Sequence, residues 1–384
     1  MVVMNSLALD AYLARCTSAI LRGEVVPPWP ADLSGDSRAA AARIGFHGIA
    51  LLIAQAPGAL DSWPEELARK LREQAGLQTF WEAGHRAAIA RLLEALADAG
   101  ITAVVTKGTA LAYSVYADPA VRRRGDTDIF VPQADRGKVR RVLRACGFWE
   151  AGDTKALQES WQADSAIGLE PAVDIHWRIN ASAAVSRLLE AELRFDSTVP
   201  LERLSPRARG VSPVDNLILT AINRSAHGQF GYFSDSDRIF ETNRLVWAID
   251  THLLARSFGP DEWQTLTDRA TRTGTTKLVS DSLAFAERAL GTLVPPSITQ
   301  ALAAAPANPD LAAYLGSSSH LWRLKADLAA CTSLGELGRV LRYVALPSDE
   351  FLQARFPEAS GWPRPALHLR RWCEGAGKLL IGRS

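Results

Sequence analysis

The stretch from Ile101 to Val131, ITAVVTKGTALAYSVYADPAVRRRGDTDIFV, decides the fold of this chain. It begins with a run rich in β-branched residues, Ile101–Val105, which predicts a short strand. The KGT that follows predicts a glycine turn, which opens a helix over Ala110–Tyr116. Strand-forming residues return in Asp126–Val131 and predict a second strand. A strand, a glycine turn, a helix and a second strand indicate an α/β unit.

The sequence after this stretch continues the same pattern. A helix is expected over Pro132–Ala145, with proline at its start and Gly147 just beyond its end. Short apolar runs then predict strands at Phe148–Glu150, Ala166–Glu170 and Val173–Trp177. The whole unit amounts to roughly a hundred residues of α/β sequence.

Helical sequence flanks this unit on both sides. Arg86–Ala99 repeats apolar residues at helical spacing, and Gly100 suits the left-handed position that ends a helix. Beyond Leu201, helices are expected at Pro213–Arg224 and Arg238–Ala255. We therefore predict an α+β fold with an N-terminal helical region over residues 1–85, a small mixed-sheet core over 86–200 and a C-terminal helical domain over 201–384.

Composition excludes several classes of protein. The 384 residues include 43 Lys and Arg against 42 Asp and Glu, and this balance argues against a general nucleic-acid-binding surface. The four cysteines are far apart, so neither a disulfide framework nor a zinc site is expected. The N-terminal residues make a poor signal peptide, and the best apolar stretch, Gly48–Leu60, is too short to span a bilayer. A cytoplasmic protein without stable membrane insertion is expected.

Three aspartates are candidates for a metal site. Residues i and i+2 of a strand project to the same face, so Asp126 and Asp128 are expected to point together. Two ionised carboxylates this close repel each other unless a cation lies between them, and Mg²⁺ prefers such oxygen ligands. Asp174 and His176 likewise share a face of their strand, and Asp174 supplies a third carboxylate. A shared metal cluster requires Asp174 within about 8 Å of Asp126 or Asp128.

The KGT segment is a candidate phosphate site. A turn after a strand that opens a helix lets a phosphate approach backbone N–H groups and the positive end of the helix dipole. Lys107, Gly108 and Thr109 have this position, and Arg122 adds a cation four residues before Asp126. Phosphate, metal and carboxylates together are the equipment of phosphoryl or nucleotidyl transfer.

The order of these residues resembles a known family. It is similar to the nucleotidyltransferase superfamily of the DNA polymerase β type, and specifically to a large, poorly characterised bacterial branch. That branch shows Lys-Gly, a tyrosine, an arginine, Asp-x-Asp and later Asp-x-His-Trp, which here are Lys107, Gly108, Tyr116, Arg122, Asp126, Asp128, Asp174, His176 and Trp177. His227-Gly228, the run RLVWAID ending at Asp250, and LPSDEFLQARFP at residues 346–357 extend the resemblance. Thr127 departs from it, because a hydrophobic residue is commoner there.

The resemblance implies an enzyme with a nucleotidyltransferase core. It would move a nucleoside monophosphate from a nucleoside triphosphate, with Mg²⁺ or Mn²⁺, to a hydroxyl or phosphate acceptor. Asp126, Asp128 and Asp174 would hold the metal, and Asp174 would also help to deprotonate the acceptor. Lys107, Gly108 and Thr109 would contact the triphosphate, while Arg122 would offset the charge of the leaving pyrophosphate.

Several alternatives stay open at this point. The acceptor is a small molecule or a protein or peptide, and RNA is less favoured because the net charge is near zero. His176 either orients a substrate and accepts a proton or is a hydrogen-bonded packing residue. His227 and Asp250 belong either to the acceptor side of the site or to the scaffold. The alternative function is a catalytically silent module that binds a nucleotide or a partner with the same fold.

Overall fold

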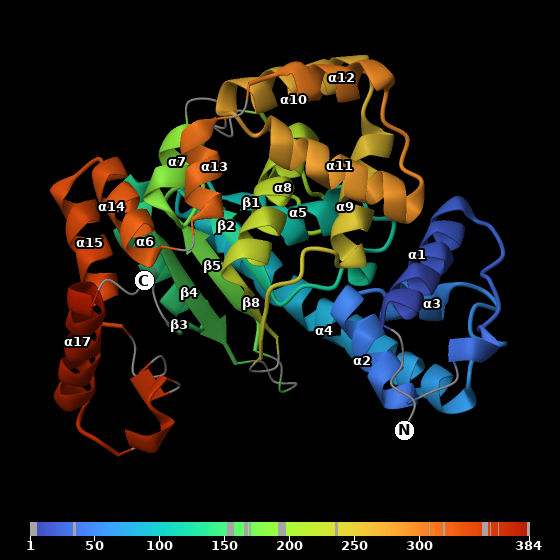
Figure 1. The fold of residues 1–384 in the computed structure, drawn as a ribbon, viewed down its shortest axis with the longest axis horizontal. Coiled ribbons are helices and arrows are strands. Elements are labelled where there is room, and N and C mark those ends of the chain that lie inside the picture. Colours follow the sequence, from blue (N-terminus) through green and yellow to red (C-terminus); the bar gives the residue numbers. More distant parts are fainter. Residues whose placement is uncertain are drawn as a thin grey trace. The chain divides into compact units, whose positions relative to one another are not determined.

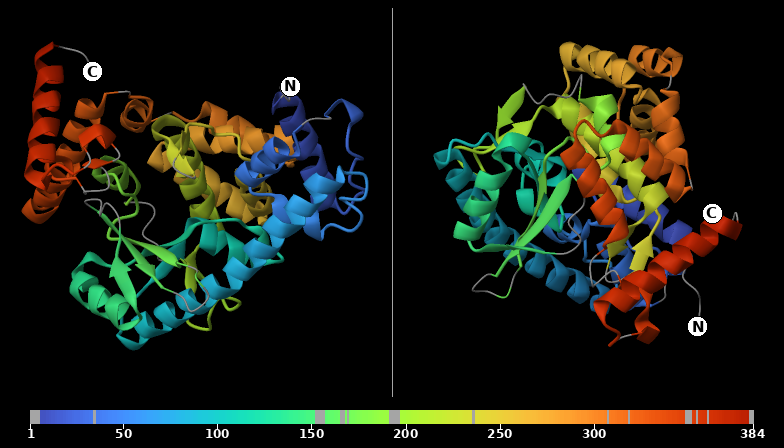
Figure 2. Two further views of the ribbon diagram at one scale, coloured as in Figure 1. Left: turned by 90° about the horizontal axis from the view of Figure 1, so that it is seen from below. Right: turned by 90° about the vertical axis from the view of Figure 1, so that its left-hand side faces the viewer.

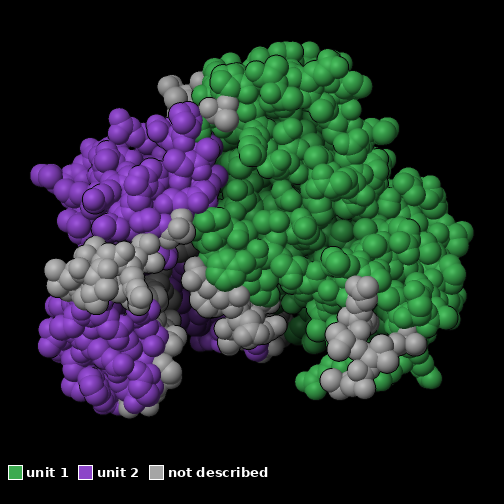
Figure 3. Space-filling view, in the orientation of Figure 1, with its two compact units in different colours: residues 1–90, 105–127, 195–308 green, residues 91–104, 128–194, 309–384 purple. Residues whose placement is uncertain are grey.

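The structure is a computed structural model of the chain (Figure 1). It describes residues 6–33, 36–151, 157–164, 168, 170–190, 197–234, 237–306, 308–317, 319–347, 352–353, 355–359 and 361–381. The chain forms two compact units, each built from three separate segments (Figure 3). Unit 1 comprises residues 1–90, 105–127 and 195–308, and unit 2 comprises residues 91–104, 128–194 and 309–384.

Within the described residues, seven strands form one mixed sheet. They are β1 (Val104–Thr106), β2 (Asp126–Phe130), β3 (Phe148–Glu150), β4 (Gln158–Ala163), β5 (Ala172–His176), β6 (Thr198–Pro200) and β7 (Arg209–Val211). Their order across the sheet is β3-β4-β5-β2-β1-β7-β6. The β1–β7 pair is parallel, whereas β3–β4, β4–β5 and β6–β7 are antiparallel. The α+β fold with a mixed sheet is therefore confirmed.

Helices make up most of the chain before and after the sheet. The N-terminal helices are α1 (Ser6–Arg22), α2 (Ser37–His47), α3 (Ala50–Gln55) and the long α4 (Glu65–Asp98), drawn in blue shades in Figure 2. Those after residue 201 are α8 (Pro213–Phe230), α9 (Leu245–Ser257), α10 (Pro260–Thr273), α11 (Thr276–Leu290), α12 (Pro296–Ala304), α13 (Pro309–Gly316), α14 (His320–Ala330), α15 (Leu334–Ala345) and α17 (Arg364–Ile381). None of the described helices is long and apolar enough to cross a membrane.

The prediction for the segment after β1 is wrong in its bounds. Helix α5 spans Lys107–Ser114 and so begins three residues earlier than expected, with Thr106 as its extended N-cap residue. Among the described residues, Lys107 is the only one other than glycine with a positive φ, 52°. The chain therefore turns at Lys107, and Gly108 already lies inside the helix.

The region around β4 also differs from the expectation. The predicted strand at Ala166–Glu170 lies largely outside the described residues, whereas Gln158–Ala163, for which no strand was predicted, is β4. Its sequence QESWQA is polar, and in isolation it does not indicate a strand. Trp161 is fully buried, and antiparallel pairing with β5 supplies the partners for the backbone. Tertiary context, which a local pattern does not contain, makes this segment a strand.

Helix α6 (Arg136–Ala145) follows a 3₁₀ turn at Gln133–Asp135 rather than beginning at Pro132. Its Arg136 and Arg140 side chains both bind the fully buried carboxylate of Glu159 on β4. Glu159 is paired with Ile175 in the β4–β5 ladder, one residue out of step with Asp174. Arg136 and Arg140 of α6 therefore lie over the face of the sheet opposite to Asp174.

Two predicted helices after residue 201 have different ends. Helix α8 continues six residues beyond Arg224 to Phe230, and α9 begins only at Leu245. The first two residues of the second predicted helix, Arg238 and Ile239, belong instead to β9 (Asp237–Ile239), which pairs with β8 (Tyr232–Ser234) as a two-stranded sheet. Backbone pairing in this hairpin replaces the expected first turns of the helix.

Candidate functional site

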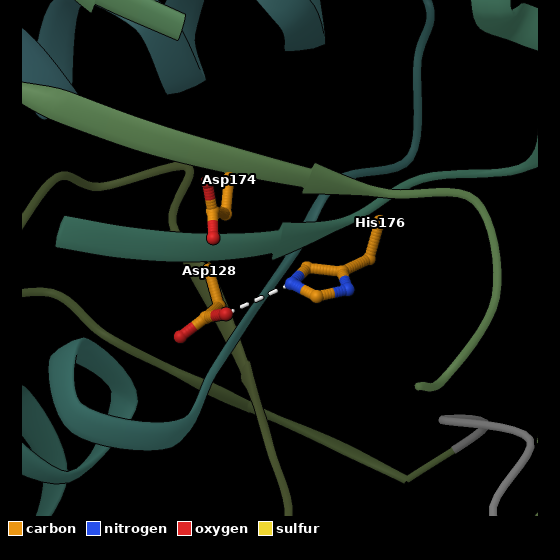
Figure 4. A group of neighbouring side chains, drawn as sticks. All are labelled: Asp128, Asp174 and His176. Atoms are coloured by element: carbon orange, nitrogen blue, oxygen red, sulfur yellow. Dashed lines mark hydrogen bonds and ion pairs between the residues drawn. The ribbon is translucent and has the colours of Figure 1, made fainter. Parts of the chain in front are cut away.

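Asp128, Asp174 and His176 form a cluster in unit 2 (Figure 4). One potential ligand atom from each residue lies within 4.8 Å of the other two. The His176 Nε2 atom is 2.8 Å from Asp128 Oδ1, and both side chains are buried. The two carboxylates are therefore within the separation that a shared metal cluster requires.

Strand pairing explains why Asp174 faces Asp128. Asp174 and His176 occupy alternate positions of β5 and so lie on one face of that strand. In the neighbouring strand β4, Ser160 Oγ donates to Asp174 Oδ1 at 2.6 Å, and the Gln158 side-chain amide donates to Oδ2. These donors, which sequence reasoning missed together with β4, fix the orientation of the Asp174 carboxylate.

Asp126 opens β2, two residues before Asp128. The alternation of the strand gives these two side chains the same face, and Thr127 between them is fully buried on the other face. Asp126 is partly exposed, whereas Asp128 is 7% exposed. The more buried of the two carboxylates is thus the one that contacts His176.

The donor set of this cluster fits a hard divalent cation. Two carboxylates held this close repel each other when ionised, and a cation between them removes the repulsion. Carboxylate oxygens suit Mg²⁺ and Mn²⁺, while an imidazole nitrogen suits Mn²⁺ better than Mg²⁺. Because His176 Nε2 already contacts Asp128, this side chain is placed to orient a ligand carboxylate, as groups that hydrogen-bond metal ligands do.

The N-terminus of α5 lies in unit 1 and carries the predicted phosphate-binding residues. The N–H groups of Gly108 and Thr109 are in the first turn of α5, where an α-helix has no intrahelical acceptors. Asn216 of α8 donates from Nδ2 to the Lys107 carbonyl at 3.4 Å. The left-handed residue at this turn is therefore held from a second helix.

Arg122 packs against this turn and is fixed by Asp250. Its Nε is 2.8 Å from Asp250 Oδ1 and its Nη2 is 2.8 Å from Oδ2, while the Tyr116 hydroxyl donates to Oδ1 at 2.7 Å. Burial opposes the charge on Arg122, but the fully buried Asp250 carboxylate outweighs it and raises the pKa of the guanidinium. Arg122 is therefore a permanent, oriented cation.

Gly108 has a packing role that the sequence did not reveal. A Cβ atom at this position would lie 3.3 Å from Arg122 Nη1 and 3.4 Å from Arg122 Cζ. Glycine thus allows the guanidinium to approach the backbone at the start of α5. We predicted that Gly108 makes the turn, but the residue with the left-handed backbone conformation is Lys107.

The Thr109 hydroxyl is used inside the protein. Thr109 is 1% exposed, and its Oγ1 accepts from Arg124 Nε at 3.0 Å and lies 2.9 Å from Thr127 Oγ1. The hydroxyl is therefore committed to contacts inside the protein. Thr127, which departs from the family pattern, has its hydroxyl bonded to Thr109 and to His85 Nε2, the latter at 2.7 Å.

His227 and Asp250 have different surroundings. Asp250 is the partner of Arg122 and Tyr116, so its place in the apolar run RLVWAID marks a buried ion pair. His227 Nε2 lies 3.1 Å from Asn223 Oδ1, and its ring meets Trp247 edge-on at 5.6 Å. The last matching segment, residues 346–357, lies partly outside the described residues.

The free energy of unfolding should fall as the pH drops below about 6.5, the ordinary histidine pKa. Burial, and then the charge of Arg124, hold the pKa of His85 well below its usual value. The unfolded chain therefore binds a proton that the folded chain refuses, which costs up to about 1.4 kcal/mol per pH unit for one histidine. Guanidinium denaturation between pH 7.5 and 5.5 measures this slope.

His47 and His252 contribute to that slope with the same sign, since burial lowers the pKa of each. The variant His85→Gln should therefore show a smaller slope than the wild type, but not a flat profile. An unchanged slope in His85→Gln would contradict the assignment of a neutral His85.

The fold and the site define an α+β protein with a carboxylate cluster on neighbouring strands of a mixed sheet. Residues 34–291, more than half of the chain, match a family model described as uncharacterised nucleotidyltransferase. The chain belongs to this nucleotidyltransferase family, which confirms the resemblance seen in the sequence. A search of curated proteins gave no match.

Proposed function

We propose that this protein is a metal-dependent enzyme that transfers a nucleoside monophosphate from a nucleoside triphosphate to an acceptor hydroxyl or phosphate. The acceptor is a small molecule or a protein or peptide side chain. The observation that carries this proposal is the cluster of Asp128, Asp174 and His176 in a member of a nucleotidyltransferase family. Two buried or half-buried carboxylates this close together repel each other, so they are unfavourable where side chains serve packing alone.

Asp128 and Asp174 would hold the divalent cation, Mg²⁺ or Mn²⁺, and Asp126 would join them from the same face of β2. When bound, the cation supplies charge neutralisation for the phosphates and lowers the pKa of the attacking oxygen. His176 orients the Asp128 carboxylate, and Ser160 with Gln158 orients Asp174. These fixed donors keep the carboxylates in place before the substrate binds.

The triphosphate would bind at the start of α5. The N–H groups of Gly108 and Thr109 and the positive end of the helix dipole suit a phosphate, and the Lys107 side chain adds a cation. Arg122, held by Asp250, would offset the charge on the leaving pyrophosphate. This assignment agrees with the close approach of the guanidinium to Gly108.

The chemical step is a single displacement at the α-phosphorus. The acceptor oxygen forms a bond to the α-phosphorus while the bond to the oxygen that bridges to the β-phosphate breaks, and pyrophosphate leaves with that electron pair. The proton of an acceptor hydroxyl passes to Asp174, which the hydrogen bonds from β4 hold in position. Positioning and charge neutralisation account for most catalysis of this kind.

The test is an incubation of the purified protein with Mg²⁺ or Mn²⁺ and NTPs labelled at the α- or γ-phosphate, with fractionated lysate as the source of acceptors. We expect the α-label to appear in an acceptor and the γ-label to leave as pyrophosphate. Transfer of the γ-label instead would indicate a kinase. Nucleotide binding with no pyrophosphate release across all fractions would favour the silent binding module.

A further inference from the structure

A buried polar network lies behind β2, on the face opposite to Asp126 and Asp128, and the proposed function does not use it. It joins Thr109, Thr127, His85, Arg124 and Glu82, all of which belong to unit 1. Each of these side chains is at most 9% exposed. Burying polar groups costs free energy unless they are hydrogen-bonded, so the partners of these side chains show what the network stabilises.

The network is a continuous chain of hydrogen bonds that ends on the backbone of Asp126. His85 Nε2 lies 2.7 Å from Thr127 Oγ1, which lies 2.9 Å from Thr109 Oγ1. Thr109 Oγ1 in turn lies 3.3 Å from the carbonyl oxygen of Asp126. Arg124 Nε donates to the same Thr109 oxygen at 3.0 Å.

The donors and acceptors of this chain fix its direction. A carbonyl can only accept and a guanidinium can only donate, while each threonine has one proton and two lone pairs. All the contacts are satisfied when His85 Nε2–H donates to Thr127, Thr127 donates to Thr109, and Thr109 donates to the Asp126 carbonyl. This is the one arrangement that makes every contact of the chain a hydrogen bond, because the reverse direction leaves the Asp126 carbonyl without the Thr109 proton.

Helix α4 holds His85 at one end of this chain and, through Glu82, the Arg124 side chain that joins it. Glu82 accepts from Arg124 Nη2 at 2.9 Å and from the Tyr113 hydroxyl, so it fixes the guanidinium. Trp81 stacks on His85 with ring centroids 4.3 Å apart, and its ring also lies 5.5 Å from Arg124 Cζ. A buried hydrogen-bond network of this kind makes one backbone arrangement more favourable than its alternatives.

We propose that Thr109, Thr127 and His85 are positioning residues that fix the backbone of Asp126 against the first turn of α5. Thr109 is the link between the two sites. Its backbone N–H belongs to the predicted phosphate site, while its hydroxyl donates to the carbonyl of Asp126 at the start of β2. The network thereby sets the spacing between bound triphosphate and the start of β2. This inference rests on the proposed function.

The test uses pairs of substitutions that separate the hydroxyl from the shape of the side chain. Thr109→Val and Thr127→Val keep the shape and remove the hydroxyl, whereas Thr109→Ser and Thr127→Ser keep the hydroxyl. Thr17→Val is the matched control, since Thr17 is equally buried in unit 1 and its hydroxyl donates to the Leu13 carbonyl of its own helix. Hydrogen exchange of residues 124–128 and turnover per folded molecule are measured for each.

We expect both valine variants to speed exchange in residues 124–128 and to lower kcat by up to about 10²-fold, the cost of a small misplacement of reacting groups. Thr127→Ser should stay close to the wild type, Thr109→Ser should show a smaller effect than Thr109→Val, and Thr17→Val should change neither measurement. Unchanged exchange in the valine variants would overturn the positioning role whether or not the enzyme turns over. Faster exchange with wild-type kcat would overturn its link to catalysis, and an inactive wild type would refute the proposed function alone.

Discussion

Replacing Asp128 by asparagine should lower the rate of nucleotidyl transfer by at least about 10²-fold, the cost of losing one electrostatic stabiliser of a transition state. Asparagine keeps the shape of the side chain and can still hydrogen-bond His176, so the fold should survive. It removes the negative charge that would pair with the proposed divalent cation. Pyrophosphate release at saturating nucleotide and a titration with Mn²⁺ are the two measurements, and both should show the loss.

Asp268→Asn is the control for this substitution. Asp268 is an exposed carboxylate on α10 that accepts from Gln264 on its own helix, so the same change of charge should leave transfer unaffected. If Asp128→Asn is folded and transfers at the wild-type rate, Asp128 is not a metal ligand in the reaction. The cluster with Asp174 and His176 would then be a structural feature only.

Asp250→Asn should destabilise the protein by about 3–5 kcal/mol, because it leaves the guanidinium of Arg122 buried without a counter-charge. Asp250 is fully buried, and its two oxygens hold Arg122 and the Tyr116 hydroxyl together. Denaturation by guanidinium measures this loss. Asp10→Asn should cost less, because Asp10 is partly exposed and its partner Arg43 keeps Glu241 as a second counter-charge.

A double variant separates the stability of this ion pair from its function. Asp250→Leu combined with Arg122→Met removes both charges, and replacing a buried pair by apolar residues often restores stability. We expect the double variant to regain much of the lost stability. It should remain inactive, because the Arg122 guanidinium next to Gly108 is no longer present. Recovery of transfer along with stability would show that Arg122 serves the fold alone.

The part of the candidate site that the sequence predicted is the part governed by local rules. Strand alternation places Asp126 with Asp128 and Asp174 with His176 from residue order alone, because side chains alternate along a strand by a fixed geometry. The order of the segments likewise indicates a small mixed sheet flanked by helices. The distance between Asp128 and Asp174 is not predictable in this way, since it depends on the pairing of strands far apart in the chain.

Other features depend on contacts that no local pattern contains. The polar strand β4, with the donors to Asp174, exists because β5 and the buried Trp161 support it. The left-handed turn falls on Lys107 rather than on Gly108, whose missing side chain serves the approach of Arg122. In both cases a neighbour in space overrides the preference of the residue itself.

By itself, the sequence determined which residues share a face of a strand, because side chains alternate along a strand. It also determined which family the chain belongs to, because residues 34–291 match that family. Only the tertiary structure decided that Asp250 is the partner of Arg122 and that Thr127 is bonded to His85. The members of each pair are separated by 128 and by 42 positions along the chain. Burial turns such distant residues into partners, since a charge or hydroxyl removed from water must find its hydrogen bonds within the protein.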